Sequence, residues 1–179
     1  MKPVCLVLGA GAGIGGTVAA KFASEGYHSY LCRRSDQEGL DKLIKGIEDA
    51  GGSASGSLMN AIEEDALEEV ITKVESDVGP IEVLVYNLGA QTGMKLLSQT
   101  THKEFEWGWR MASFGLFRVA KILCPIMAER GKGTFLVTSA TAAMRGNATQ
   151  HSHAAAMGAR RMLCQSLNAE FASKGIHVA

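Results

Sequence analysis

Glycines cluster between residues 9 and 16, directly after an apolar run at residues 3–8 and before a helical pattern at residues 17–24. Glycine lets a backbone come close to a pyrophosphate, and the first amides of the following helix carry a partial positive charge. The order strand, glycine loop, helix therefore predicts a site for the phosphates of a dinucleotide. The residues assigned to it are Gly9, Gly11, Gly13, Ile14 and Gly15. A tight turn that only packs helix against strand is the alternative.

Two arginines, Arg33 and Arg34, follow the second predicted strand, roughly 20 residues beyond the glycine loop. An acidic residue at this place would bind the ribose 2′-hydroxyl of NAD, whereas a guanidinium fits a 2′-phosphate in charge and in bidentate geometry. The sequence therefore predicts NADP as the cofactor, and NAD is the less favoured choice. Two solvated arginines without a ligand are the competing interpretation.

The elements that would hold these groups alternate along the chain. Apolar runs that suit strands buried on both faces lie at residues 3–8, 28–32, 54–58, 81–86 and 133–138. Apolar residues with helical spacing lie between them, and further helices are expected at about 101–130 and 151–174. This alternation predicts a doubly wound parallel α/β sheet of the Rossmann type, with three α/β/α layers, in one domain over residues 1–179.

Capping boxes predict where three of these helices begin. In such a box a polar residue caps the helix and a glutamate follows three residues later. The pairs are Ser35 with Glu38, Asn60 with Glu63, and Thr101 with Glu104. Gly108 and Gly115 are expected to weaken the helix that begins at the third box.

Composition argues against several functions. Eighteen basic and eighteen acidic residues cancel, so no net charge draws the chain to nucleic acid or to an anionic membrane. The four cysteines are far apart in the sequence and lack metal-ligand spacing, so no metal site is predicted. The apolar run at residues 4–8 is too short for a signal peptide or a transmembrane helix, and we expect a cytoplasmic protein.

Four segments, in the right order, resemble the short-chain dehydrogenase/reductase family over essentially the whole chain. Residues 9–15 match the glycine pattern of that family, and residues 86–89 are similar to its Asn-Asn-Ala-Gly segment. Residues 133–140 match its fifth strand, and residues 170–178 match the segment after its catalytic helix. The resemblance adds three residues to the cofactor site: Asn60, which would accept a bond from the adenine amino group, Asn87 and Gly89.

The family transfers a hydride between nicotinamide and a carbonyl or alcohol carbon, with a tyrosine, a lysine, a serine and an asparagine at its active site. These roles fall on His153 for the tyrosine, Met157 for the lysine, Ala140 for the serine and Ala112 for the asparagine. No tyrosine follows Tyr86, and Lys174 is the only lysine after residue 132. The resemblance therefore implies an atypical member that lacks the usual active-site residues.

Two residues are candidates for the missing chemistry. His153 could transfer the proton, because histidine is the commonest general acid–base residue near neutral pH. Ser139, beside Ala140, keeps a hydroxyl. An NADP(H)-binding oxidoreductase with an atypical proton donor is one hypothesis, and a catalytically silent nucleotide-binding sensor or scaffold is another. A structural subunit that binds no nucleotide is a third.

The resemblance also implies a small-molecule substrate and a homo-oligomer formed through the helices near 101–130 and 151–174. A last strand is predicted at residues 176–178, just before the sequence stops. We therefore expect a chain that lacks the final strand or strands and the segment that covers the substrate in this family.

Overall fold

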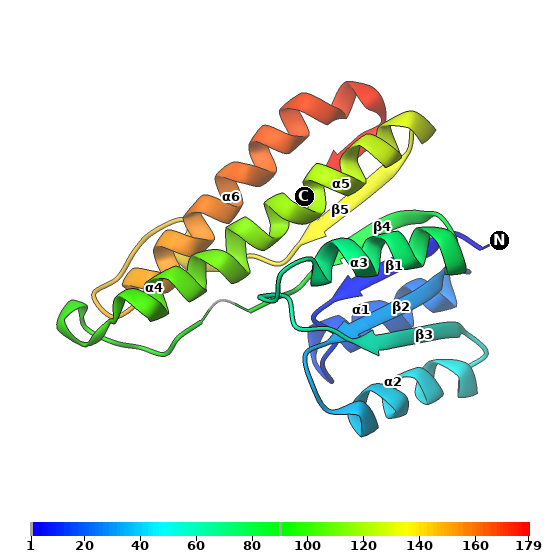
Figure 1. The fold of residues 1–179 in the computed structure, drawn as a ribbon, viewed down its shortest axis with the longest axis horizontal. Coiled ribbons are helices and arrows are strands. Elements are labelled where there is room, and N and C mark those ends of the chain that lie inside the picture. Colours follow the sequence, from blue (N-terminus) through cyan, green and yellow to red (C-terminus); the bar gives the residue numbers. More distant parts are fainter. Residues whose placement is uncertain (1, 90) are drawn as a thin grey trace.

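The computed structural model describes residues 2–89 and 91–179. Within these residues a parallel sheet has six strands in the order β3-β2-β1-β4-β5-β6 (Figure 1). The strands are β1 (Val4–Leu8), β2 (His28–Arg33), β3 (Ser53–Leu58), β4 (Ile81–Tyr86), β5 (Gly133–Val137) and β6 (Ile176–Val178). The strand order reverses between β1 and β4. Sheets of this kind bind ligands outside the carboxyl ends of the strands at such a reversal.

Helices cover both faces of the sheet, which explains why the central strand β1 is continuously apolar rather than alternating. In β1, Cys5 and Val7 face a core cluster under α1 (Ile14–Ser24) and α2 (Gln37–Asp49). Leu6 and Leu8 face the opposite cluster. That cluster lies under α3 (Ala66–Lys73), α5 (Gly115–Arg130) and α6 (His151–Phe171). The predicted three-layer, doubly wound fold is confirmed.

The remaining helices are short and join the larger elements. They are η1 (Val74–Val78), η2 (Leu97–Gln99), α4 (His102–Trp109), η3 (Arg110–Phe114), η4 (Thr141–Ala143) and η5 (Ala172–Lys174). Of these, η1 and η3 are π-helical and η2, η4 and η5 are 3-10 turns.

Two of the three predicted capping boxes are wrong. The α2 cap is Asp36, whose Oδ1 accepts the Gly39 amide at 2.9 Å, so Ser35 lies outside the helix. Asn60 donates to Glu63 at 2.9 Å, but α3 begins only at Ala66. The third box is confirmed, because the side chain of Thr101 accepts the Glu104 amide and Glu104 returns a bond to the Thr101 amide.

The predicted helix at 101–130 is helical throughout but not uniformly α-helical. It consists of α4, the π turn η3 and α5. By length and composition the stretch His102–Arg130 would suffice to cross a membrane, and half of its most apolar window is buried, as in the core helices of globular proteins. Single π turns inside α-helices occur frequently at functional sites.

Candidate functional site

The glycine loop joins β1 to α1 at the strand reversal (Figure 1). Among the described residues, no partner is found for the backbone amides of residues 12–15, which run from the end of the loop into the first turn of α1. A Cβ at Gly11 or Gly13 would meet nothing within 4 Å, so open space lies above these amides. Unpaired amides at a helix start and room beside them fit a pyrophosphate.

Two other glycines of the loop are required by packing. A Cβ at Gly15 would lie 2.3 Å from the carbonyl oxygen of Gly9. Gly9 has a φ of +95°, and its Cβ would lie 2.6 Å from the carbonyl oxygen of Asn87. The loop is therefore folded tightly against the end of β4, and Ile14 stays 60% exposed at its tip.

Asn87 connects three segments at the carboxyl end of the sheet. Its Nδ2 donates to the Gly9 carbonyl at 3.0 Å, and its Oδ1 accepts from the Thr138 hydroxyl at 2.7 Å. Both ends of the amide are thus engaged, and the side chain acts here by holding the glycine loop. Gly89, two residues further on, is exposed beside this loop.

Arg33 and Arg34 follow β2 on the other side of β1, and the structure gives them different surroundings. Arg33 is partly buried, and its Nη2 lies 2.9 Å from Asp36 Oδ2. A Cβ at Gly39 would lie 2.5 Å from Arg33 Nη1, so the absence of a side chain at Gly39 leaves room for this guanidinium. Arg34 is exposed, and among the described residues it forms no ion pair.

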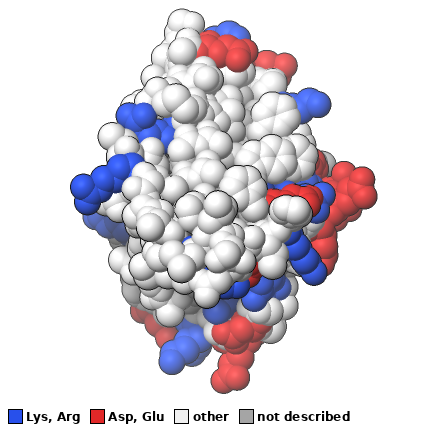
Figure 2. Space-filling model, turned by 90° about the vertical axis from the view of Figure 1, so that its left-hand side faces the viewer, with Lys and Arg blue, Asp and Glu red and all other residues white. Residues whose placement is uncertain are grey.

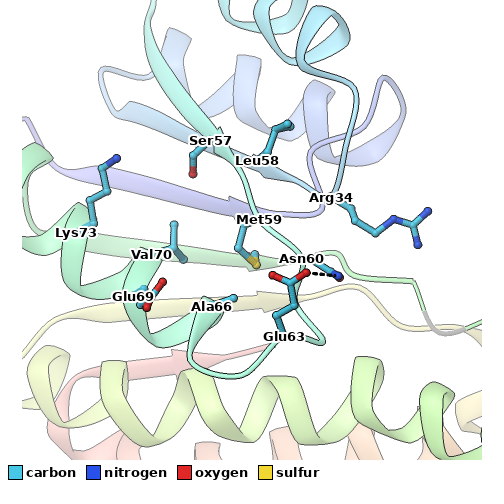
Figure 3. A pocket seen from close by; sticks show the side chains of 10 residues that line it. All are labelled: Arg34, Ser57, Leu58, Met59, Asn60, Glu63, Ala66, Glu69, Val70 and Lys73. Atoms are coloured by element: carbon cyan, nitrogen blue, oxygen red, sulfur yellow. Dashed lines mark hydrogen bonds between the residues drawn. The ribbon is translucent and has the colours of Figure 1, made fainter.

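Arg34 and Asn60 border the same hollow, of about 460 Å³, between β3 and α3 (Figure 3). Arg34 extends away from the other lining side chains. Asn60 uses its Nδ2 on Glu63, which leaves its Oδ1 free to accept a bond. The structure therefore gathers the predicted adenosine-binding residues beyond the ends of β2 and β3.

The three positions that the resemblance assigns to the lysine, the asparagine and the serine lie together in the structure, and the residues there are apolar. Met157 and Ala112 are buried in one cluster with Ala156, and Ala140 is packed against it. A buried apolar cluster at this place offers no polar group to a substrate.

His153 and Ser139 flank this cluster but do not share a cavity. The Nδ1 of His153 is buried, and no partner for it is found among the described residues. Ser139 is exposed and lines a hollow of about 510 Å³ together with Thr141, Arg160 and Arg161, and His153 is not among the lining residues. A buried polar atom without a partner is costly, and His153 lines none of the hollows described here.

Arg160 is not among the predicted site residues, although it lies on the helix face of His153, where an arginine could approach a cofactor phosphate or ribose. It is 2% exposed, and its guanidinium donates to three backbone carbonyls: Nε to Ala112 at 3.0 Å, Nη1 to Thr138 at 2.8 Å and Nη2 to Leu88 at 2.8 Å. The guanidinium carbon also lies 5.1 Å from the centre of the Tyr86 ring. Burial lowers the pKa of this guanidinium, which nevertheless keeps its charge.

The π turn explains why such a residue is needed. A π turn interrupts the regular helical bonding, and two successive carbonyls of η3 accept bonds from buried side chains instead. Met111 accepts from the Tyr86 hydroxyl at 2.6 Å, and Ala112 accepts from Arg160. Gly115 is required here, since its Cβ would lie 2.3 Å from that hydroxyl. Burial raises the pKa of Tyr86, so its hydroxyl stays protonated and able to donate.

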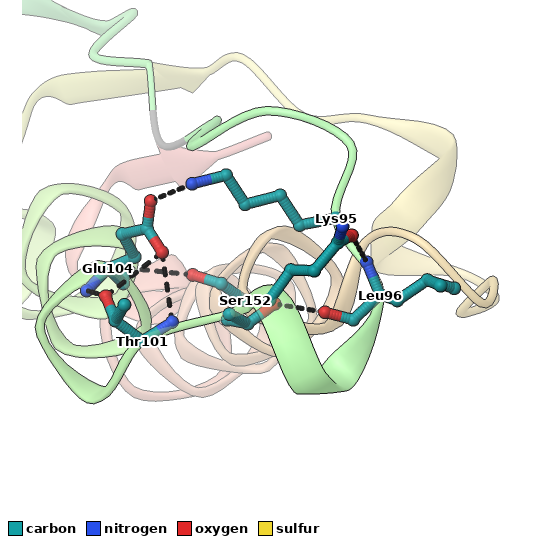
Figure 4. Close-up of polar contacts among 7 residues, drawn as sticks. Lys95, Leu96, Thr101, Glu104 and Ser152 are labelled. Atoms are coloured by element: carbon teal, nitrogen blue, oxygen red, sulfur yellow. Dashed lines mark hydrogen bonds and ion pairs between the residues drawn. The ribbon is translucent and has the colours of Figure 1, made fainter.

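The stretch from Lys95 to the start of α4 lies beside the start of α6 and is fixed there by polar contacts (Figure 4). The Lys95 amide donates to the Thr149 carbonyl at 2.8 Å, and the Lys95 ammonium pairs with Glu104. Ser152 donates to the Glu104 carbonyl at 3.0 Å, one residue before His153. The hydrogen bond from Lys95 is the main cause that lowers the pKa of Glu104 to about 2.

A glycine loop between the first strand and helix of a sheet in this order defines a dinucleotide-binding α/β protein. The family model described as short chain dehydrogenase matches residues 3–179. The chain therefore belongs to the short-chain dehydrogenase family.

Similar proteins include enzymes of known class. The 3-oxoacyl-acyl-carrier-protein reductase FabG of Thermotoga maritima is 29% identical over 175 residues, which cover 98% of this chain and 70% of that protein. A short-chain dehydrogenase from Rhodopseudomonas palustris superposes with a TM-score of 0.93 at 32% identity, covering 99% of this chain and 82% of the other. A gluconate 5-dehydrogenase from Burkholderia cenocepacia, in complex with NADP and tartrate, gives 0.88 at 27% identity, with coverages of 98% and 68%. The chain spans about two thirds of the length of its curated relatives, 66% for one of them.

Proposed function

We propose that the chain binds NADP(H) and works as an oxidoreductase on a carbonyl or alcohol substrate, with an atypical proton donor. The observation that carries the proposal is the row of unpartnered amides at residues 12–15 beneath open space. Such a site binds phosphate through N–H groups and the helix dipole. NADP in the Burkholderia cenocepacia relative supports the same cofactor here.

The chain's own residues divide the work of binding. The glycine loop would hold the pyrophosphate, Arg33 and Arg34 the 2′-phosphate, and Asn60 the adenine. Asn87 would keep the loop in place, and Gly89 leaves room beside it. NADP(H) supplies or accepts a hydride when it is bound.

His153 is the proposed proton donor, and Ser139 the proposed group that orients the substrate. The place of His153, where the resemblance puts the family's tyrosine, supports the first role, because histidine is a common general acid–base residue near neutral pH. The test is NADPH consumption over a panel of aldehydes and ketones by the wild type and by His153→Ala, with His151→Ala as a matched control at the same helix start. We expect a loss of roughly 100-fold in turnover for His153→Ala only. Equal rates for all three proteins would exclude His153 as the donor.

A second candidate function, a catalytically silent nucleotide-binding protein, is favoured by one observation. Met157, Ala112 and Ala156 form an apolar cluster where the family has its lysine and asparagine. If this candidate is right, calorimetry will detect NADPH binding while the carbonyl panel gives no oxidation above background. Turnover with any carbonyl that depends on His153 would reject it.

We also propose that the chain forms a homo-oligomer through α4, α5 and α6. Exposed aromatic side chains lie on the first two helices, and Trp109 stacks on Phe114 at 5.2 Å, which in turn stacks on Phe117 at 6.5 Å. Trp109 and Phe117 are 43% and 47% exposed. The end of the molecule formed by α4 and the start of α6 is largely uncharged, with charged groups at its rim (Figure 2). Light scattering should give more than one chain per particle, and Phe117→Glu should lower that number.

A further inference from the structure

Arg160 carries a permanent positive charge in the protein interior, where an unpaired charge has a high desolvation cost. It is among the largest fully buried side chains, and within the described residues no carboxylate lies at ion-pairing distance from it. Its partners are three carbonyl oxygens and an aromatic ring, all of them neutral. Such partners hold a guanidinium in place but leave its net charge uncompensated.

The charge lies on one side of the strand reversal. Arg160 bonds the carbonyls of Leu88 and Thr138, which come directly after β4 and β5. The residues assigned to the adenosine half of the cofactor lie on the other side, beyond β2 and β3. A dinucleotide that crosses the reversal with its pyrophosphate at the glycine loop must therefore put its nicotinamide half on the side of Arg160.

We propose that Arg160 sets the redox preference of the site, so that the reduced cofactor binds more tightly than the oxidised cofactor. The nicotinamide ring carries a positive charge only when it is oxidised. A fixed, buried cation on the same side of the reversal repels that ring, whereas it leaves the neutral, reduced ring unaffected. This inference rests on the proposed function, since it requires NADP(H) to bind here.

The physical size of such an effect makes it measurable. Two unit charges roughly 6 to 10 Å apart, at an effective dielectric constant near 20, change a dissociation constant by roughly tenfold to a hundredfold. We therefore expect the wild type to bind NADPH at least about tenfold more tightly than NADP+. Arg161, the next residue, is a suitable control, because it lines the hollow with Arg160 but is less buried.

Two substitutions distinguish the effect of the Arg160 charge from the effect of its hydrogen bonds to the three carbonyls. Arg160→Lys keeps the charge but loses the planar guanidinium with its several donors. Arg160→Gln keeps N–H donors but loses the charge. Calorimetry would give the dissociation constants of NADPH, NADP+ and 2′,5′-ADP, a fragment without nicotinamide. We expect Arg160→Lys to retain the preference for NADPH and Arg160→Gln to bring the two dinucleotides to within about threefold. The affinity for 2′,5′-ADP and the preference of Arg161→Gln should stay as in the wild type.

Each other outcome overturns a definite statement. Equal affinity of the wild type for NADPH and NADP+ overturns the inference without any variant, while binding of 2′,5′-ADP leaves the proposed function standing. A preference that persists in Arg160→Gln, or that disappears equally in Arg161→Gln, also overturns it. Absence of binding by all three ligands to the wild type rejects the proposed function and the inference together. If Arg160→Gln does not fold, equal affinities of the wild type or of Arg160→Lys for NADPH and NADP+ still overturn the inference.

Discussion

The two sides of the strand reversal differ in the groups that they present to a ligand. Beyond β1, β2 and β3, the loop amides, Arg34 and the Oδ1 of Asn60 are free to meet a ligand. Beyond β4 and β5, Met157 and Ala112 lie at the positions that the resemblance gives to the lysine and the asparagine. The charged group on this side, the guanidinium of Arg160, is buried against backbone carbonyls. The difference teaches that one sheet can carry unpaired polar groups at one end of the reversal and a closed apolar cluster at the other, so that fold alone does not fix what the site does.

The largest effect is expected from Gly15→Val. Its side chain would begin 2.3 Å from the Gly9 carbonyl oxygen, so the loop must move and its amides lose their alignment. We expect NADPH binding to weaken by at least about a thousandfold, which is detectable by calorimetry. The control is Gly46→Ala in α2, where an added Cβ meets nothing within 4 Å. Normal NADPH binding by Gly15→Val would mean that the cofactor does not use this loop.

The next largest effect is a gain on the other side of the reversal. The double variant His153→Tyr/Met157→Lys restores the two residue types that the family uses, in a cluster whose neighbours are small alanines. We expect NADPH-dependent turnover of the best carbonyl to rise by roughly 100-fold over the wild type. The control, His153→Tyr/Met162→Lys, puts the lysine on an exposed position of the same helix. If the control gains as much, the position of the lysine is not what matters.

A smaller effect should separate the two arginines. Arg34 has no ion-pair partner among the described residues, whereas Arg33 shares its charge with Asp36. We expect Arg34→Ala to weaken NADPH binding about tenfold and to leave NADH binding unchanged, since only NADPH has a 2′-phosphate. Arg145→Ala, an exposed arginine in the loop after η4, serves as the control. Equal losses for both cofactors in Arg34→Ala would assign the residue a structural role.

The smallest effect concerns pH and the contact of Lys95 with Glu104. The pKa of Glu104 is lowered from 4.5 to about 2, so its stabilising contribution is present above pH 4.5 and is lost as the pH falls towards 2. Glu104→Gln should lower the melting temperature by a few degrees near pH 7, and the difference from the wild type should shrink below pH 4. Glu106→Gln should change the melting temperature much less, because the ion pair of Glu106 with Arg110 is longer, at 3.7 Å, and exposed. A difference that stays constant with pH would contradict the assignment.

Much of the fold was predictable because the spacing and the number of apolar residues in a segment reflect how that segment is buried. Strands covered on both faces give short apolar runs, and each predicted run lies within a residue or so of an observed strand. Helix starts were less predictable. Ser35 and Asp36 are adjacent possible caps, and the structure selects the second, because the Asp36 carboxylate accepts the Gly39 amide while its backbone adopts a left-handed φ of +73°.

The candidate site was predictable only in the glycine loop, where backbone groups form the binding surface. The glycine spacing identifies the loop, since close contacts such as that of Gly15 with Gly9 admit no side chain. The hydrogen bonds of Arg160 could not be identified in this way, because its partners are backbone carbonyls from three separate segments. Every residue has a backbone carbonyl, so residue types do not indicate which ones accept. The one available signal was an arginine one turn beyond Met157 in an otherwise apolar helix face.

The amide of Asn87 has a mechanical consequence. It joins the turn after β1 to the hydroxyl of Thr138, and the carbonyl of Thr138 is in turn bonded to Arg160. Any ligand that immobilises the turn will therefore also restrict thermal motion at the far end of β5, even without touching it. Hydrogen exchange should slow at residues 138–141 when only 2′,5′-ADP is added, and Asn87→Ala should abolish that remote protection.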